Sequence, residues 1–133
     1  MTINYYYIQV GNTLRFLRLG KNYHQTHIAN TIGYQKPMCS KIESGKSKSI
    51  SIDKFELICA ALGINTSTVI DLAKQPVFKQ KINSFEELFL SLEASSYEQI
   101  FKISELTKDA LPQKYAEFKS RFDKLLGEKR AAV

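Results

Sequence analysis

The stretch that most constrains the fold is residues 23–48, YHQTHIANTIGYQKPMCSKIESGKSK, which contains two short helical patterns with a glycine between them. The first pattern covers about residues 25–31 and places three apolar side chains on one face, namely Ile28, Ala29 and Ile32. Gly33 follows where a helix C-cap favours a residue that can adopt a positive φ angle. These residues therefore predict a helix that ends in a tight turn.

The second pattern, residues 36–44, begins directly after that turn. Pro37 is compatible only with the first turn of a helix, and Cys39 and Ile42 follow three residues apart on one face. The small Ala29 lets the two helices cross closely, so the spacing predicts a helix-turn-helix with a wide crossing angle. In such a motif the second helix projects into the major groove of DNA while the first crosses the phosphate backbone.

Three more helical patterns accompany the motif within residues 1–75. One precedes it over residues 8–21, with an apolar face made of Val10, Leu14, Phe16 and Leu17. Another follows Ser51 and Asp53 and stops at Gly63, with an apolar face made of Phe55, Ile58, Cys59 and Leu62. The last starts after Thr66 or Ser67 and buries Val69, Ile70 and Leu72. The first half of the chain is therefore expected to form a domain of five short helices.

Residues 76–133 have a different character, because they predict about three amphipathic helices with near-neutral charge. The first begins after Ser84, the second near Tyr97 and the third at Pro112. Their apolar faces contain Phe85, Leu88, Phe89, Leu92, Tyr97, Ile100, Phe101, Ile103, Leu106, Tyr115, Phe118, Phe122, Leu125 and Leu126. About 50 residues are too few to bury such faces alone, so we expect them to pack on the N-terminal domain, on a partner subunit or on both. The aromatic stretch 4–8 is a candidate to join that surface. The fold class is all-α.

The charge of the chain is concentrated in its first half. Residues 1–75 contain nine Lys and Arg against four Asp and Glu, whereas residues 76–133 contain ten against nine. Within residues 15–48 seven basic side chains face the single acid Glu43. Such a segment attracts polyanions. The alternative is a solvated basic face without a partner.

On these residues, positions 11–73 resemble the Cro/repressor-type helix-turn-helix family of bacterial and phage regulators, also called the xenobiotic-response-element family. The matching residues are Leu14, Leu17, Arg18, Gln25, Ile28, Ala29, Ile32, Gly33, Ile42, Glu43, Gly45, Lys46, Leu62 and Gly63. The chain departs from the family at His24 and Gln35, where Ser or Thr usually caps the motif helices, and at Pro37, an early position of the recognition helix. The resemblance implies a DNA-binding domain.

Two groups of residues are candidate DNA contacts. The base-reading candidates lie on the side of helix 36–44 opposite the buried Cys39 and Ile42, and they are Lys36, Met38, Ser40 and Lys41. Lys can donate to guanine and Met can pack on a thymine methyl. The phosphate-contacting candidates are Arg15, Lys21, Gln25, Lys46 and Lys48, of which Gln25 is implied by the resemblance. For all of these, a solvated helix face or surface loop is the alternative interpretation.

Arg18 and Glu43 are expected to act differently. The resemblance implies an ion pair that joins the first helix to the recognition helix and fixes the angle at which that helix is presented. No nucleophile with a base and no glycine-rich phosphate loop is found, so we expect no enzyme and no cofactor. His24, His27, Cys39 and Cys59 lack a zinc-binding spacing, so no metal is predicted, and both cysteines are expected to be reduced core residues.

The sequence therefore predicts a DNA-binding transcriptional regulator, in particular a repressor that binds an inverted-repeat operator as a homodimer joined through residues 84–126. One alternative is an antitoxin-type autoregulator whose C-terminal helices bind a toxin or another protein. Another is an interaction module that has lost DNA binding. No apolar run reaches the length of about 18 residues that a membrane span requires. The N-terminus does not resemble a signal peptide, so a cytoplasmic protein of bacterial or phage type is expected.

Overall fold

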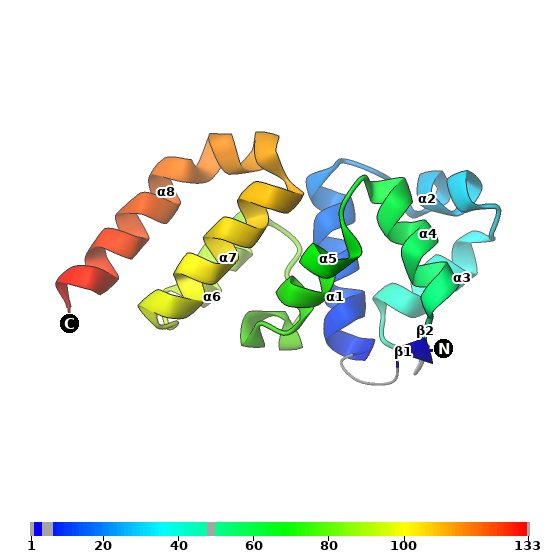
Figure 1. Cartoon of the computed structure of the whole chain (residues 1–133), viewed down its shortest axis with the longest axis horizontal. Helices are drawn as coiled ribbons and strands as arrows, with labels where there is room; N and C mark the ends of the chain where they lie inside the picture. Colours follow the sequence, from blue (N-terminus) through cyan, green and yellow to red (C-terminus); the bar gives the residue numbers. More distant parts are fainter. Residues whose placement is uncertain (1, 4–6, 48–49, 133) are drawn as a thin grey trace.

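The computed structural model describes residues 2–3, 7–47 and 50–132, and this part of the chain is almost entirely helical (Figure 1). The first five helices are α1 (Tyr7–Gly20), α2 (Gln25–Ile32), α3 (Lys36–Glu43), α4 (Ile52–Leu62) and α5 (Thr66–Ala73). A 3-10 turn, η1 (Pro76–Lys79), leads to α6 (Phe85–Leu92), α7 (Tyr97–Ala110) and α8 (Pro112–Ala131). The predicted all-α class is confirmed.

Two very short strands were not predicted from the sequence. Strand β1 (Thr2–Ile3) pairs antiparallel with β2 (Ile50–Ser51), so that Thr2 lies opposite Ser51. Strands of two residues are too short to show the alternation by which strands are recognised in a sequence. Their pairing holds the beginning of the chain against the residues that precede α4.

The glycine caps at the C-terminal ends of α2 and α4 match the sequence prediction. Gly33 caps α2 with a φ of 77°, and Gly63 caps α4 with a φ of 71°. At the other end of each motif helix, His24 and Gln35 make no side-chain cap hydrogen bond. By contrast, three serines do cap later helices, since the side chains of Ser51, Ser84 and Ser96 accept backbone N–H bonds. Packing, rather than capping, must therefore stabilise α2 and α3.

One buried apolar cluster runs through both halves of the chain, with α1 and α5 between the motif and α6–α8 (Figure 1). The ring of Phe16 on α1 lies 5.5 Å from that of Phe78 and 5.2 Å from that of Phe85. The side-chain amide of Asn12 donates to the carbonyl of Phe78 at 2.9 Å. The C-terminal helices were expected to pack on the N-terminal helices, on a partner subunit or on both. The first of these is observed within the chain.

Two details of the predicted core are wrong. Phe101 is 47% exposed, because Ile100 and Ile103 take the inner face of α7 and Phe101 instead stacks on Tyr97 with 6.1 Å between ring centroids. Ile70 is only half-buried. In the aromatic stretch 4–8, residues 4–6 lie outside the described residues, and Ile8 is 47% exposed.

No single helix in the described ranges is long and apolar enough to cross a membrane. Helices α4 and α5 satisfy length and composition only when taken together, across a bend of 102°.

Candidate nucleic-acid interface

Helix α3 presents one polar face to solvent and buries the other. Cys39 and Ile42 are 3% exposed, whereas Lys36, Ser40 and Lys41 are exposed to solvent. Met38 differs from the sequence expectation, because it is half-buried and packs against the core. The reason is its spacing: a residue four positions before Ile42 shares the inner face of the helix. Only part of the Met38 side chain is therefore available to a ligand.

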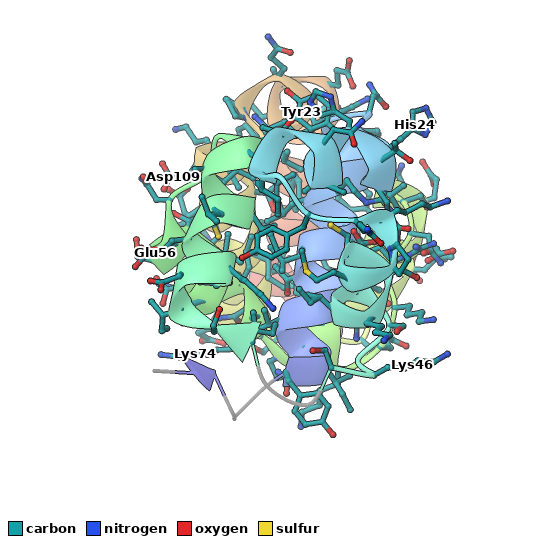
Figure 2. All side chains as sticks on the ribbon, turned by 90° about the vertical axis from the view of Figure 1, so that its right-hand side faces the viewer. Tyr23, His24, Lys46, Glu56, Lys74 and Asp109 are labelled. Atoms are coloured by element: carbon teal, nitrogen blue, oxygen red, sulfur yellow. The ribbon has the colours of Figure 1, made fainter. Side chains whose placement is uncertain are left out.

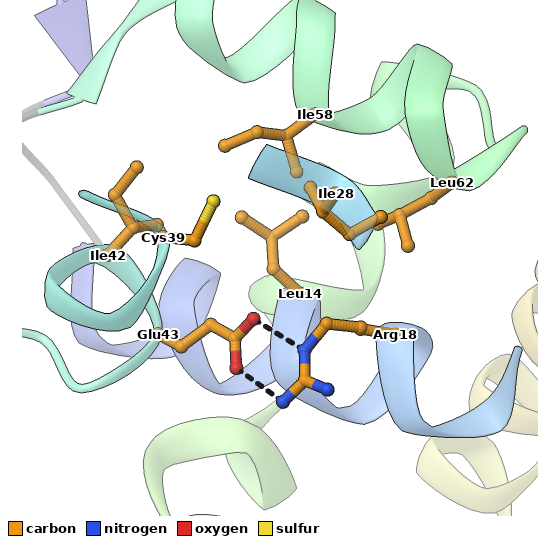
Figure 3. A pocket seen from close by; sticks show the side chains of 8 residues that line it. All are labelled: Leu14, Arg18, Ile28, Cys39, Ile42, Glu43, Ile58 and Leu62. Carbon is orange, nitrogen blue, oxygen red and sulfur yellow. Dashed lines mark hydrogen bonds and ion pairs between the residues drawn. The ribbon is translucent and has the colours of Figure 1, made fainter. Parts of the chain in front are cut away.

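A buried ion pair attaches α3 to α1 (Figure 3). The guanidinium of Arg18 donates from Nε to Oε2 of Glu43 at 2.7 Å and from Nη2 to Oε1 at 2.9 Å. The two side chains are 8% and 9% exposed. The third nitrogen, Nη1, donates to the carbonyl of Tyr23 at 2.7 Å. One guanidinium thus ties together α1, the turn before α2 and the end of α3, which is the pairing that the family resemblance implied.

Gln25 joins the same network. It is the first residue of α2, and its Nε2 donates to Oε1 of Glu43 at 3.1 Å. The start of α2 is therefore fixed to the end of α3 through a single carboxylate. Because the first backbone N–H groups of a helix have no partner within the helix, a phosphate placed at this end would find donors in place.

Arg15 lies beside this network and also contacts the C-terminal region. Its Nη1 is 3.8 Å from Oε1 of Glu43, and its Nε donates to Oδ1 of Asn83 at 2.8 Å. The side chain is 32% exposed. The sequence predicted Arg15 as a phosphate contact. No sequence pattern indicated that its guanidinium would also donate a hydrogen bond to Asn83, 68 positions later. Any DNA contact by Arg15 is therefore linked to the position of the segment that precedes α6.

Gly11 is a residue that the sequence analysis missed. A Cβ atom at this position would lie 2.2 Å from the carbonyl oxygen of Ile42 and 3.2 Å from that of Glu43. Helix α1 therefore approaches the end of α3 at backbone distance. The available signal was a glycine inside an otherwise regular helical pattern, which often marks close approach of another backbone.

A helix-turn-helix family model matches residues 14–69. The match covers the motif helices, the Arg18–Glu43 pair and the first half of α5. This segment is a Cro/repressor-type helix-turn-helix domain. Domains of this family are typical of DNA-binding transcriptional regulators. No curated protein and no solved structure matches the chain.

The helix-turn-helix motif lies at one end of the molecule (Figure 1 and Figure 2). Figure 2 views the end of the molecule that carries the motif, with His24 and Lys46 at opposite ends of the edge formed by α3, and with Glu56 and Asp109 on the other side. Lys46 is exposed in the loop after α3, and Lys21 is half-buried in the turn after α1. Lys48 lies outside the described residues.

The cysteines of the helix-turn-helix domain are free and buried. Burial raises the pKa of the Cys59 thiol to about 12. Burial also raises the pKa of Cys39, with a further contribution from the nearby Glu43 carboxylate. Both thiols are therefore protonated at neutral pH. Among the described residues, no group of three or more His, Cys, Asp and Glu side chains is close enough to hold a metal.

Proposed function

We propose that this protein is a sequence-specific transcriptional repressor that binds an inverted-repeat operator as a homodimer. Helix α3 enters the major groove of each half-site. Lys36, Ser40 and Lys41 meet base edges, with the exposed part of Met38 against a thymine methyl. Gln25, Lys21 and Lys46, together with Arg15, contact phosphates. Its proposed location is the bacterial cytoplasm, which contains the DNA.

The observation that carries this proposal is the anchoring of an exposed basic helix by buried polar bonds. Two hydrogen bonds from Arg18 and one from Gln25 converge on Glu43, at the C-terminal end of the helix that exposes Lys36 and Lys41. A buried ion pair is a poor source of net stability, because both charges lose their hydration. Its benefit is orientation, and a fixed orientation matters when a helix must meet base edges in a groove.

Dimerisation follows from the size of the exposed face. One short helix can contact only about four base pairs, which is too few to define a site, so two copies have to bind together about 34 Å apart. We place the tether within residues 84–126. Most apolar side chains of this segment are buried in the chain itself, but Leu90 is 66% and Phe101 47% exposed. These two residues are the proposed contacts to the second copy.

Selection of binding sites from a pool of random duplex DNA tests the proposal. We expect an inverted repeat whose half-sites are one helical turn or a multiple of it apart, and an affinity that falls steeply with salt. Sedimentation of wild-type protein and of a Leu90→Lys, Phe101→Lys double variant tests the dimer. A selected site without two-fold symmetry, or no selection at all, contradicts the proposal.

The same exposed Leu90 and Phe101 favour one alternative, in which the protein is an antitoxin-type autoregulator. In that case the two side chains contact a toxin instead of a second copy. The purified protein would then be monomeric at micromolar concentration, and its expression would relieve growth arrest caused by the product of a neighbouring gene.

A further inference from the structure

A groove separates the helix-turn-helix domain from the start of α8. It has a volume of about 400 Å³ and is lined by two segments far apart in the chain, one containing Lys21 and Tyr23 and the other Lys114 and Glu117. In Figure 1 the two segments meet where the loop between α1 and α2 lies beside the beginning of α8. The groove therefore exists only because the C-terminal region packs on α1.

The groove brings together two lysines. Lys21 comes from the turn before α2 and Lys114 from the first turn of α8, and both line the groove. In the part of the chain that the structure describes, Lys21 forms no ion pair, while Nζ of Lys114 lies 3.6 Å from Oε2 of Glu117. The Lys114 and Glu117 side chains are 32% and 60% exposed, so this pair is weak and open to competition by another anion.

The groove ends next to the start of α2, where the proposed phosphate contact Gln25 lies. Tyr23, which lines it, is followed directly by His24 and Gln25 at the start of α2. Figure 2 shows Tyr23 and His24 side by side at one end of the motif. A DNA backbone that passes the start of α2 and continues beyond it would next meet Lys21 and then Lys114.

We propose that the C-terminal region binds DNA as well: Lys114, together with Lys21, contacts backbone phosphates of the duplex that flanks each half-site. This inference rests on the proposed function. The contact carries no base information and adds affinity through counterion release. Glu117 opposes it by pairing with Lys114. Because Lys114 belongs to α8, the extra affinity depends on the packing of the C-terminal region against the motif.

The test compares two duplexes, the site selected from the random pool trimmed to its defined bases, and the same site extended by about one helical turn, or 10 base pairs, on each side. Lys114→Gln should weaken binding to the extended duplex roughly fivefold and reduce its salt slope by about 0.9 per protomer. Glu117→Gln should strengthen binding to the extended duplex. Neither change should alter binding to the trimmed duplex.

Lys124→Gln is the matched control, because Lys124 is exposed on the same helix and does not line this groove. It should bind both duplexes like wild type. Ethylation of flanking phosphates should weaken wild-type binding more than Lys114→Gln binding, because the variant keeps only the Lys21 contact. Equal effects of Lys114→Gln and Lys124→Gln, or no effect of Lys114→Gln on the extended duplex, overturn this inference and leave the proposed function intact. Failure of wild-type protein to bind any duplex overturns both.

Discussion

The helix-turn-helix domain and the helices that follow it are stabilised by different kinds of contact. In the domain, a buried network centred on Glu43 joins α1, α2 and α3. In the C-terminal region, aromatic rings pack on one another: Phe85 and Phe118 stack with 4.5 Å between ring centroids, and Phe89 and Phe122 meet edge to face at 4.8 Å. Ring packing provides burial but little directional control, whereas bidentate hydrogen bonds define an angle. The directional contacts lie behind α3, the proposed recognition helix.

The charges differ in the same way. The nine basic and four acidic residues of positions 1–75 give a balance of +5, against +1 from the ten basic and nine acidic residues of positions 76–133. In the C-terminal region the opposite charges pair on the surface, as in Arg121 with Glu86 and Lys119 with Asp123. The first region keeps a positive balance, whereas the second largely neutralises its own charge.

The largest effect is expected from Glu43→Ala. The change leaves the Arg18 charge buried without its partner, which should cost about 3–5 kcal/mol of unfolding free energy and release the recognition helix, so that DNA binding is lost. Thermal denaturation and a gel-shift assay measure the two effects. Glu86→Ala, which breaks the exposed pair with Arg121, is the control and should cost less than about 1 kcal/mol. A Glu43→Ala variant that melts at the wild-type temperature would contradict the view that the network around Glu43 stabilises this domain.

Phe122→Ala should affect the other region. Phe122 is fully buried against Phe89, so its removal leaves a cavity and should cost about 3–5 kcal/mol of unfolding free energy. Because the ring is remote from α3, the variant should keep its sequence preference at a temperature where it remains folded. Denaturant unfolding followed by site selection checks both parts. A changed preference would show that aromatic packing also sets the recognition helix.

Gly11→Ala tests the contact between α1 and α3. The new methyl group has to displace the Ile42 carbonyl, which should cost about 1–3 kcal/mol and shift the end of the recognition helix. Gly127→Ala is a suitable control, because a Cβ at that helical position meets no atom within 4 Å. The unfolding free energies and DNA affinities of both variants measure the effect. Equal unfolding free energies of Gly11→Ala and Gly127→Ala would refute the close approach of α3 to α1 at Gly11.

The smallest effects should separate base contacts from phosphate contacts inside the domain. Lys41→Ala should cost about 1–3 kcal/mol of binding free energy and relax the preference at one position in each half-site. Lys46→Ala should weaken binding to all sequences alike and reduce the salt slope by about 0.9. Competition assays with base-substituted duplexes distinguish the two. An altered sequence preference of the Lys46→Ala variant would contradict the proposed role of Lys46 as a phosphate contact.

Local features of the motif were predictable from the sequence because they depend on neighbouring residues. The left-handed cap at Gly33 and the placement of Pro37 in the first turn of α3 follow from backbone sterics, and the burial of Ile28 and Cys39 follows from helical periodicity. The misplacement of Phe101 shows the limit of this reasoning. A helix with apolar residues around more than half of its circumference does not itself determine which of them faces the core.

The sequence by itself determined the helix-turn-helix, its basic character and, through the family resemblance, the Arg18–Glu43 pair, since all of these are encoded in the order and spacing of residues in one segment. The tertiary structure alone decided that α6–α8 pack on α1 and that Arg15 donates a hydrogen bond to Asn83. It also decided that the backbone of α3 approaches α1 closely at Gly11. It also placed Lys114 and Lys21 in the lining of one groove. These contacts join residues far apart in the chain, and their geometry depends on how whole helices pack, which no local pattern specifies.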